Sequence, residues 1–127
     1  MTLVSPNVRE RRGPTWEPIG PASSFAPGQM HEAVVRTPGG NPTETGVYVW
    51  AESPDQFVVY SRACTDLACP VKWDPGSRWF YCPCHGGIFD RDGVPRAGPP
   101  AVPLYRYRTR IREGILEVDV FSVPPLT

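Results

Sequence analysis

The chain has 127 residues, which gives room for one compact domain rather than two. Its 13 lysines and arginines balance 13 aspartates and glutamates, so it lacks the basic field that nucleic-acid binding needs. The 17 prolines and 12 glycines favour short strands and turns, and predict an all-β fold. The sequence has neither the roughly 20 consecutive apolar residues of a membrane helix nor the apolar core of a signal peptide. We therefore expect a soluble domain, attached to a membrane only through an anchor absent from this chain.

The chain begins with a segment that has little to bury. Residues 1–15 include four charged residues in a row at 9–12 and read as an N-terminal tail or tether. Residues 30–37, 46–52, 56–62 and 78–82 are rich in Val, Tyr, Phe and Trp and are bounded by turn residues, which predicts strands. Residues 104–112 and 115–121 alternate apolar and polar side chains around Glu113-Gly114 and predict a hairpin.

Residues 64–100 have a different composition. They contain all four cysteines and one of the two histidines, with turn residues throughout and little hydrophobic periodicity. A segment that cannot build its own apolar core needs covalent or metal ties. The cysteines lie in two groups, CTDLAC at 64–69 and CPCH at 82–85. Two plain disulfides would leave the Cys-x-x-His spacing unexplained. Structural zinc sites usually use paired Cys-x-x-Cys knuckles, which these spacings do not match.

Three motifs in chain order carry a resemblance to a known family. CTDLACPV at 64–71, YCPCHGGIFD at 81–90 and GPPAVPL at 98–104 resemble the two cluster-binding loops and the proline loop of Rieske [2Fe–2S] iron–sulfur proteins of cytochrome bc complexes. The resemblance implies a Rieske fold over residues 16–127. It consists of an antiparallel β-sandwich base domain (16–63 and 99–127) and an inserted cluster-binding subdomain (64–98).

The resemblance also implies a ligand set. In the family each loop supplies one cysteine and one histidine, and the two histidines bind the same iron. Carried over by position, Cys64 and Cys82 bind one iron and His85 binds the other. The remaining two cysteines, Cys69 and Cys84, form a disulfide that joins the loops.

Asp66 stands where the family has the first-loop histidine. We expect Asp66 to bind iron, because hard oxygen ligands suit Fe(III). The alternative is that Asp66 faces water and that the site is defective or mononuclear, without quinol oxidation. His31 is the other imidazole in the chain, and we do not expect it to be a ligand because it lies in a predicted base-domain strand.

The function implied by the resemblance is one-electron transfer through exposed His85, in a subunit of a quinol–cytochrome c reductase. Cytochrome b and a c-type cytochrome would be its partners. The disulfide implies an oxidising compartment, hence the extracytoplasmic face of the membrane. A soluble Rieske ferredoxin is the other alternative, although those proteins generally lack the disulfide.

Three positions predict a low reduction potential. Asp66 adds a negative charge beside the cluster. High-potential members carry serine at position 87 and tyrosine at position 89, whose hydroxyls donate hydrogen bonds toward sulfur, whereas this chain has Gly87 and Phe89. A low potential makes menaquinol a better expected substrate than ubiquinol.

Overall fold

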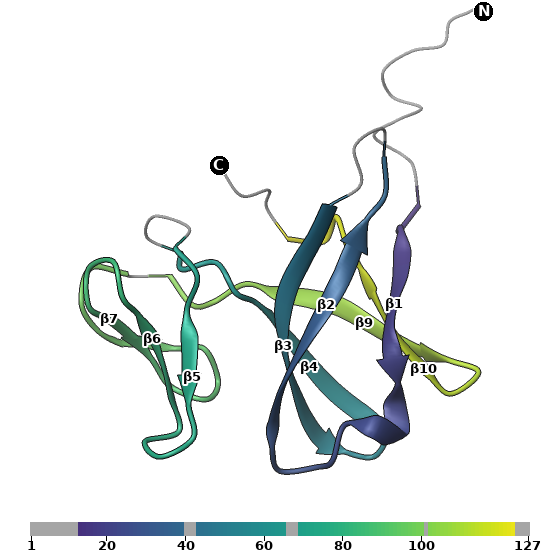
Figure 1. Cartoon of the computed structure of the whole chain (residues 1–127), viewed down its shortest axis with the longest axis horizontal. Helices are drawn as coiled ribbons and strands as arrows, with labels where there is room; N and C mark the ends of the chain where they lie inside the picture. Colours follow the sequence, from purple (N-terminus) through teal and green to yellow (C-terminus); the bar gives the residue numbers. More distant parts are fainter. Residues whose placement is uncertain (1–12, 40–42, 66–68, 101, 124–127) are drawn as a thin grey trace, which may run out of the picture.

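The computed structural model describes residues 13–39, 43–65, 69–100 and 102–123. In this part of the chain the strands form two antiparallel sheets, one of six strands and one of four (Figure 1). The described chain has one short helix, the 3-10 turn Ala22–Ser24, and no helix long and apolar enough to cross a membrane. The all-β prediction is confirmed.

The six-stranded sheet forms the base of the molecule. Its strand order is β1-β10-β9-β4-β3-β2, and every neighbouring pair is antiparallel. The sheet curls until its edge strands β1 and β2 contact each other, which gives a sandwich (Figure 1). The strands are β1 (Trp16–Pro21), β2 (Met30–Thr37), β3 (Thr43–Ser53), β4 (Gln56–Ser61), β9 (Arg106–Arg112) and β10 (Ile115–Asp119).

The base core lies inside this curled sheet. Successive side chains of a strand point to opposite faces, so Val47, Val49 and Ala51 of β3 face inward while Tyr48 and Trp50 face outward. The inner face is lined by buried apolar residues from both halves of the sandwich: Phe25, Val35, Val47, Val49, Ala51, Val59, Tyr107, Leu116, Val118 and Val120.

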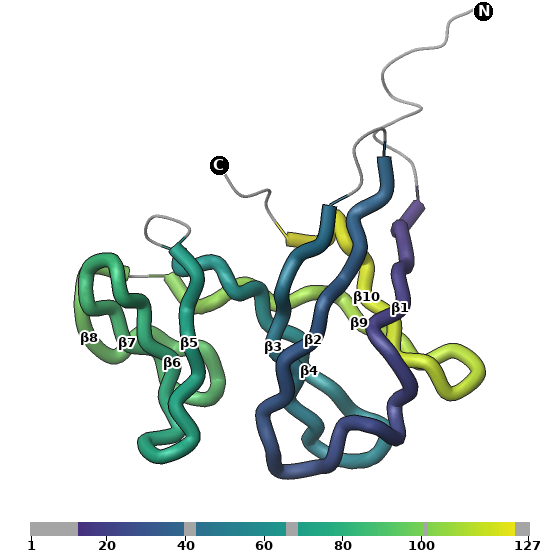
Figure 2. The backbone as a smooth tube through the Cα atoms, viewed as in Figure 1, coloured from purple at the N-terminus to yellow at the C-terminus, as the bar shows by residue number. Residues whose placement is uncertain are grey.

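The four-stranded sheet has the order β5-β6-β7-β8 and lies to one side of the base (Figure 2). Its strands are β5 (Lys72–Asp74), β6 (Trp79–Cys82), β7 (Gly87–Phe89) and β8 (Pro95–Ala97). A second apolar cluster contains residues of both sheets: Tyr48, Trp50, Tyr60, Cys64, Val71, Phe80, Cys82, Phe89 and Leu104. The outer face of β3 and β4 therefore serves as the floor on which the small sheet packs.

The small sheet is an insertion between two paired strands of the base. The chain leaves the base at the end of β4 and returns to it before β9, and these strands pair through Val59 with Tyr107 and Tyr60 with Arg106. At the junction the Ser61 N–H donates to the Tyr105 carbonyl at 2.9 Å. Figure 2 shows the two connections running together between the sheets.

The predicted strands of the base are close to the observed ones. Residues 30–37 coincide with β2, and the other predicted base strands differ from β3, β4, β9 and β10 by three residues or fewer at each end. The hairpin turn is confirmed as well, since Glu113 and Gly114 both have positive φ, 52° and 79°, as a type I′ turn requires. Strands β1, β5, β7 and β8 were not predicted.

Candidate metal centre

The first cysteine pair lies in a loop whose ends are joined by backbone bonds. The Val71 N–H donates to the Arg62 carbonyl and the Cys64 N–H donates to the Cys69 carbonyl, both at 2.7 Å. Ala63 and Pro70 form a bridge between these two bonds. Residues 66–68 lie outside the described residues, and Asp66 is one of them.

The second cysteine pair lies in the turn between β6 and β7. Cys82 pairs with Gly87 across the hairpin, and the Gly86 N–H donates to the Cys82 carbonyl at 3.1 Å. Gly86 has a φ of +76°, a conformation that glycine adopts without steric cost. This sharp turn places Cys84 and His85 at its exposed tip, while Cys82 is buried at its base.

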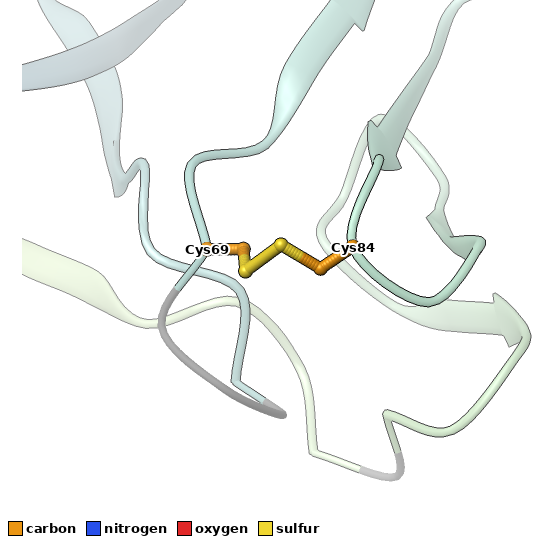
Figure 3. The surroundings of a disulfide bond; sticks show 2 residues. All are labelled: Cys69 and Cys84. Carbon is orange, nitrogen blue, oxygen red and sulfur yellow. A yellow bond between two sulfur atoms is a disulfide. The ribbon is translucent and has the colours of Figure 1, made fainter.

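A disulfide joins the two loops. It connects Cys69 to Cys84, the two cysteines that the resemblance pairs, with their Cα atoms 6.4 Å apart (Figure 3). The bond spans 15 positions of sequence and fixes the tip of the second loop against the end of the first. The loop positions therefore do not depend on apolar packing alone.

The other two cysteines lie outside the disulfide and face the interior. Cys64 and Cys82 are each 2% exposed and belong to the second apolar cluster. His85, three residues after Cys82, is exposed. One buried cysteine per loop, with an imidazole at the surface, supplies three of the four donors that Rieske centres use, which are two cysteines and two histidines.

A third segment closes over both loops. The Thr65 hydroxyl of the first loop donates to the Val102 carbonyl at 2.6 Å. Pro100, in the same segment, is buried against the second loop beside Gly87. The proline-rich motif of the sequence thus contacts both cysteine loops, through Val102 and Pro100.

The family profile described as Rieske [2Fe-2S] domain matches residues 15–109, which include both cysteine loops and the segment that covers them. The chain belongs to the Rieske [2Fe–2S] domain family. Its cofactor is accordingly a [2Fe–2S] cluster.

Two curated relatives of this Rieske domain are named as iron–sulfur subunits. The cytochrome b6-f complex iron-sulfur subunit of Chlorobaculum tepidum is 38% identical over 47% of this chain and 33% of its own length. The menaquinol:cytochrome c reductase iron-sulfur subunit of Bacillus subtilis is 39% identical over 49% of this chain and 40% of its own length. The chain thus spans less than half the length of either relative.

Solved structures agree with the fold. The plasma membrane Rieske protein of Synechocystis PCC 6803 superposes with a TM-score of 0.51 at 26% identity, over 67% of this chain and 84% of that one. A ferredoxin–oxygenase complex of carbazole 1,9a-dioxygenase contains a chain with a TM-score of 0.57 at 23% identity, covering 89% of this chain and 100% of that one. The second likeness concerns the fold alone.

Aromatic residues beneath the loops support this Rieske site, and the sequence patterns did not identify the role of three of them, Tyr48, Tyr60 and Phe80. Phe80 makes edge contacts with Tyr48, Tyr60 and Trp73, with ring centroids 4.9 to 5.5 Å apart. The Tyr48 hydroxyl donates to the Val71 carbonyl at 3.3 Å and accepts from the Trp73 N–H at 3.1 Å. The available signal was strand β3, which is apolar on both faces and so requires a second packing layer.

Tyr60 connects the base to the turn between β7 and β8 of the small sheet. Its hydroxyl donates to the Arg91 carbonyl at 2.8 Å, and the Arg106 guanidinium lies 5.3 Å from its ring centroid. Burial raises the pKa of Tyr60 from 10.0 to about 12, although the positive charge of Arg106 opposes the shift. Tyr60 therefore stays a neutral hydrogen-bond donor well into alkaline solution.

The structure places the second histidine elsewhere. His31 lies on β2 opposite Val49, a residue of the base core, and its ring contacts Phe25 with centroids 5.4 Å apart. A hydrogen bond of 3.0 Å joins its Nε2 to the Ala26 carbonyl. His31 thus packs on the inner face of the base sheet, opposite to the face that carries the small sheet.

Among the described residues, no three His, Cys, Asp or Glu side chains lie close enough to hold a single metal ion. A Rieske cluster does not require such a group, because each of its two irons takes only two protein ligands.

Two positions next to the loops also lack hydroxyls: Gly87 is buried, and Phe89 is fully buried in the second apolar cluster.

Proposed function

We propose that Cys64, Asp66, Cys82 and His85 hold the cluster, with the two cysteines on one iron and Asp66 and His85 on the other. The burial of Cys64 and Cys82 in loops joined by a disulfide is the observation that carries this proposal. Thiolates excluded from water suit the inner iron, and hard oxygen from a carboxylate suits Fe(III) at the outer one. When bound, the cluster supplies one-electron redox chemistry.

The chain's own residues would shape that chemistry in three ways. The exposed imidazole of His85 gives a partner direct contact with the ligand shell. Asp66 would add a negative charge that a neutral imidazole lacks, which disfavours the reduced state and lowers the potential. Gly87 and Phe89 offer no hydroxyl donor toward sulfur, which lowers the potential further.

We infer that the domain serves as the electron-carrying part of a quinol–cytochrome c reductase subunit, with cytochrome b and a c-type cytochrome as partners. The names of the relatives from Chlorobaculum tepidum and Bacillus subtilis support this inference. The low potential argued above and the name of the Bacillus relative favour menaquinol as the electron donor. The disulfide favours the extracytoplasmic side of the membrane, where thiols are oxidised.

The domain division follows from the same proposal. Residues 16–63 and 99–127 form the base and residues 64–98 carry the ligands, with residues 1–15 as a tether. On this division the ligand-bearing part is the insertion between β4 and β9, and the base acts as its scaffold.

The ligand assignment is tested by composition and by potential. The purified protein is expected to contain two irons and two acid-labile sulfides per chain, and to show an electron paramagnetic resonance signal on one-electron reduction. The Asp66→His variant is expected to have a higher potential, because one negative charge is removed beside the outer iron.

Asp55→His makes the same substitution at an exposed position of the β3–β4 turn and serves as the control. It is expected to leave the potential unchanged. A potential that does not rise in Asp66→His would exclude Asp66 from the ligand shell. Zinc, or a single iron without sulfide, would overturn the cluster assignment altogether.

Membership of the reductase is tested in membranes of a strain that lacks this protein. Menaquinol:cytochrome c reductase activity should be absent there, and expression of the complete wild-type gene should restore it. The Cys82→Ser variant should not. Full reductase activity without the protein would leave the two alternatives, a soluble Rieske ferredoxin and a domain with a defective or mononuclear site.

A further inference from the structure

Gly87 has no room for a side chain, and the residue that fills the space is Pro100. A Cβ atom at position 87 would lie 2.8 Å from Pro100 Cγ and 3.0 Å from Pro100 Cδ. Carbon atoms that are not bonded pack about 3.5 to 4.0 Å apart. The pyrrolidine ring of Pro100 thus lies where any larger residue at position 87 would begin.

The missing side chain would also have pointed toward the cluster ligands. The same Cβ position is 3.4 Å from the Cβ of Cys82, which pairs with Gly87 across the β6–β7 hairpin. A hydroxyl at position 87 would therefore emerge between a buried cysteine and the proline ring. The ring of Pro100 fills the space through which such a hydroxyl would approach sulfur.

Neither partner of this contact can easily move away. Proline has a fixed φ and a closed ring, so Pro100 cannot avoid a clash by changing rotamer. Two residues earlier, Gly98 has a φ of +86°, and a Cβ there would lie 2.7 Å from the Cα of Gly87 and 2.9 Å from the Gly86 carbonyl oxygen. The two backbones are thus already in close contact. Beyond Pro100, the Thr65–Val102 hydrogen bond of 2.6 Å holds the segment to the first loop.

We propose that Pro100 is a positioning residue for the metal centre. Its ring occupies the space that a side chain at position 87 would need, and so excludes a potential-raising hydroxyl from the cluster. This inference rests on the proposed function and deepens it. Gly87, Gly98 and Pro100 act as one packing unit, in which position 87 can accept serine only when position 100 is shortened. The low potential then depends on Pro100, in the segment that lies over the loops, as well as on the residue at position 87.

The test is a set of paired variants, each measured as the disulfide-bonded, cluster-loaded protein. Gly87→Ser and Gly87→Ala are made alone and together with Pro100→Ala, and Pro100→Ala alone is the reference for the pairs. Alanine at position 87 has the steric effect of serine without its hydroxyl. Thermal midpoint reports the packing, and reduction potential reports the hydrogen bond.

Each single change at position 87 is expected to lower the thermal midpoint by about 5 to 10 °C, as overpacking of a filled site does. Adding Pro100→Ala should restore at least half of that loss. Only the pair with serine should show a higher potential than Pro100→Ala alone, and the pair with alanine should match it. If Gly87→Ser fails to accumulate, recovery of a folded protein on adding Pro100→Ala supports the proposal.

Two results would overturn the inference. One is a Gly87→Ser variant with the wild-type thermal midpoint and a raised potential, because the contact would then exclude nothing. The other is a Pro100→Ala pair that restores neither stability nor accumulation. A wild-type chain without a [2Fe–2S] cluster would instead refute the proposed function, while the midpoints of the disulfide-bonded variants would still test the contact.

Discussion

The six-stranded base closes over a core that its own strands and the adjoining Phe25 and Val120 supply. The four-stranded sheet instead has its buried residues in a cluster that also includes Tyr48, Trp50 and Tyr60 of the base. The small sheet adds what the base lacks, a disulfide and the proposed metal ligands. The base can therefore hold its structure by apolar burial alone. The metal-binding region depends on packing against the outer face of the base sheet, on the disulfide and on metal ligation, as segments with small cores generally do.

The largest effect should come from removing a proposed ligand of the inner iron. Cys82→Ser is expected to abolish the cluster, because serine offers no thiolate at a buried position. Hydrogen exchange should then show protection lost in β6 and β7 but kept in β3 and β4. Full iron content in this variant would remove Cys82 from the ligand set, and equal loss of protection in both sheets would refute the independence of the base.

Truncation of one core residue in each region compares the two cores directly. Phe80 and Leu116 are both fully buried. Replacing a buried phenylalanine by alanine costs about 3 to 5 kcal/mol, and a buried leucine about 2 to 5 kcal/mol. In urea, Phe80→Ala should lose visible absorbance at a lower concentration than far-ultraviolet ellipticity. Leu116→Ala should lower both transitions together.

The disulfide should contribute less than the ligands but as much as a core residue. Its loop of about 15 residues corresponds to roughly 3 kcal/mol in the chain-entropy treatment. Replacing both Cys69 and Cys84 by serine is expected to keep a cluster that is lost faster to an iron chelator. The same rate of cluster loss in the variant and in the wild type would show that the loops are held without the covalent bond.

The smallest effect concerns the tie between the regions at Tyr60. Tyr60→Phe removes the hydrogen bond to the Arg91 carbonyl and should cost about 1 kcal/mol at neutral pH. Because the folded-state pKa is about 12 and the unfolded value is 10.0, the wild-type protein loses stability as pH rises above 10. The slope from this group approaches about 1.4 kcal/mol per pH unit.

Urea unfolding at several pH values between 8 and 12 measures this slope. The contribution of Tyr60 is complete below pH 10 and is lost between pH 10 and about 12, so the advantage of the wild type over Tyr60→Phe should vanish within this range and then reverse. Burial also raises the pKa of Tyr107, so the variant should retain part of the alkaline slope. Parallel curves for the two proteins would contradict the assignment.

Sequence patterns predicted five of the six base strands but only β6 of the small sheet, and strand length is the reason for the misses in the small sheet. Strand β2 has eight residues and the β9–β10 hairpin has a Glu-Gly turn, so period and turn chemistry were both readable. Strands β5, β7 and β8 have three residues each, too few to show a period. They form strands because neighbouring segments pair with them, which is a tertiary effect.

In the metal centre, too, the sequence predicted local features but not contacts made by tertiary packing. The motifs of both cysteine loops could be recognised because the residues of each lie close together in the sequence, and the resemblance that they carry implied the disulfide pair. Pattern alone could not reveal that Tyr48 and Tyr60 lie beneath the loops, or that Pro100 fills the space over Gly87. These contacts join residues far apart in sequence, and only the three-dimensional packing brings them together.

The junction between β4 and β9 has a consequence for how such a domain can diversify. The chain leaves and returns at positions already fixed by the pairing of Val59 with Tyr107 and by the Ser61–Tyr105 hydrogen bond. For the base, the segment between β4 and β9 is therefore one long loop whose two ends are held in fixed positions. Lengthening such a loop costs little conformational entropy. Insertions, deletions or a transplanted ligand set can accumulate beyond this junction without changing the pairing of the scaffold strands.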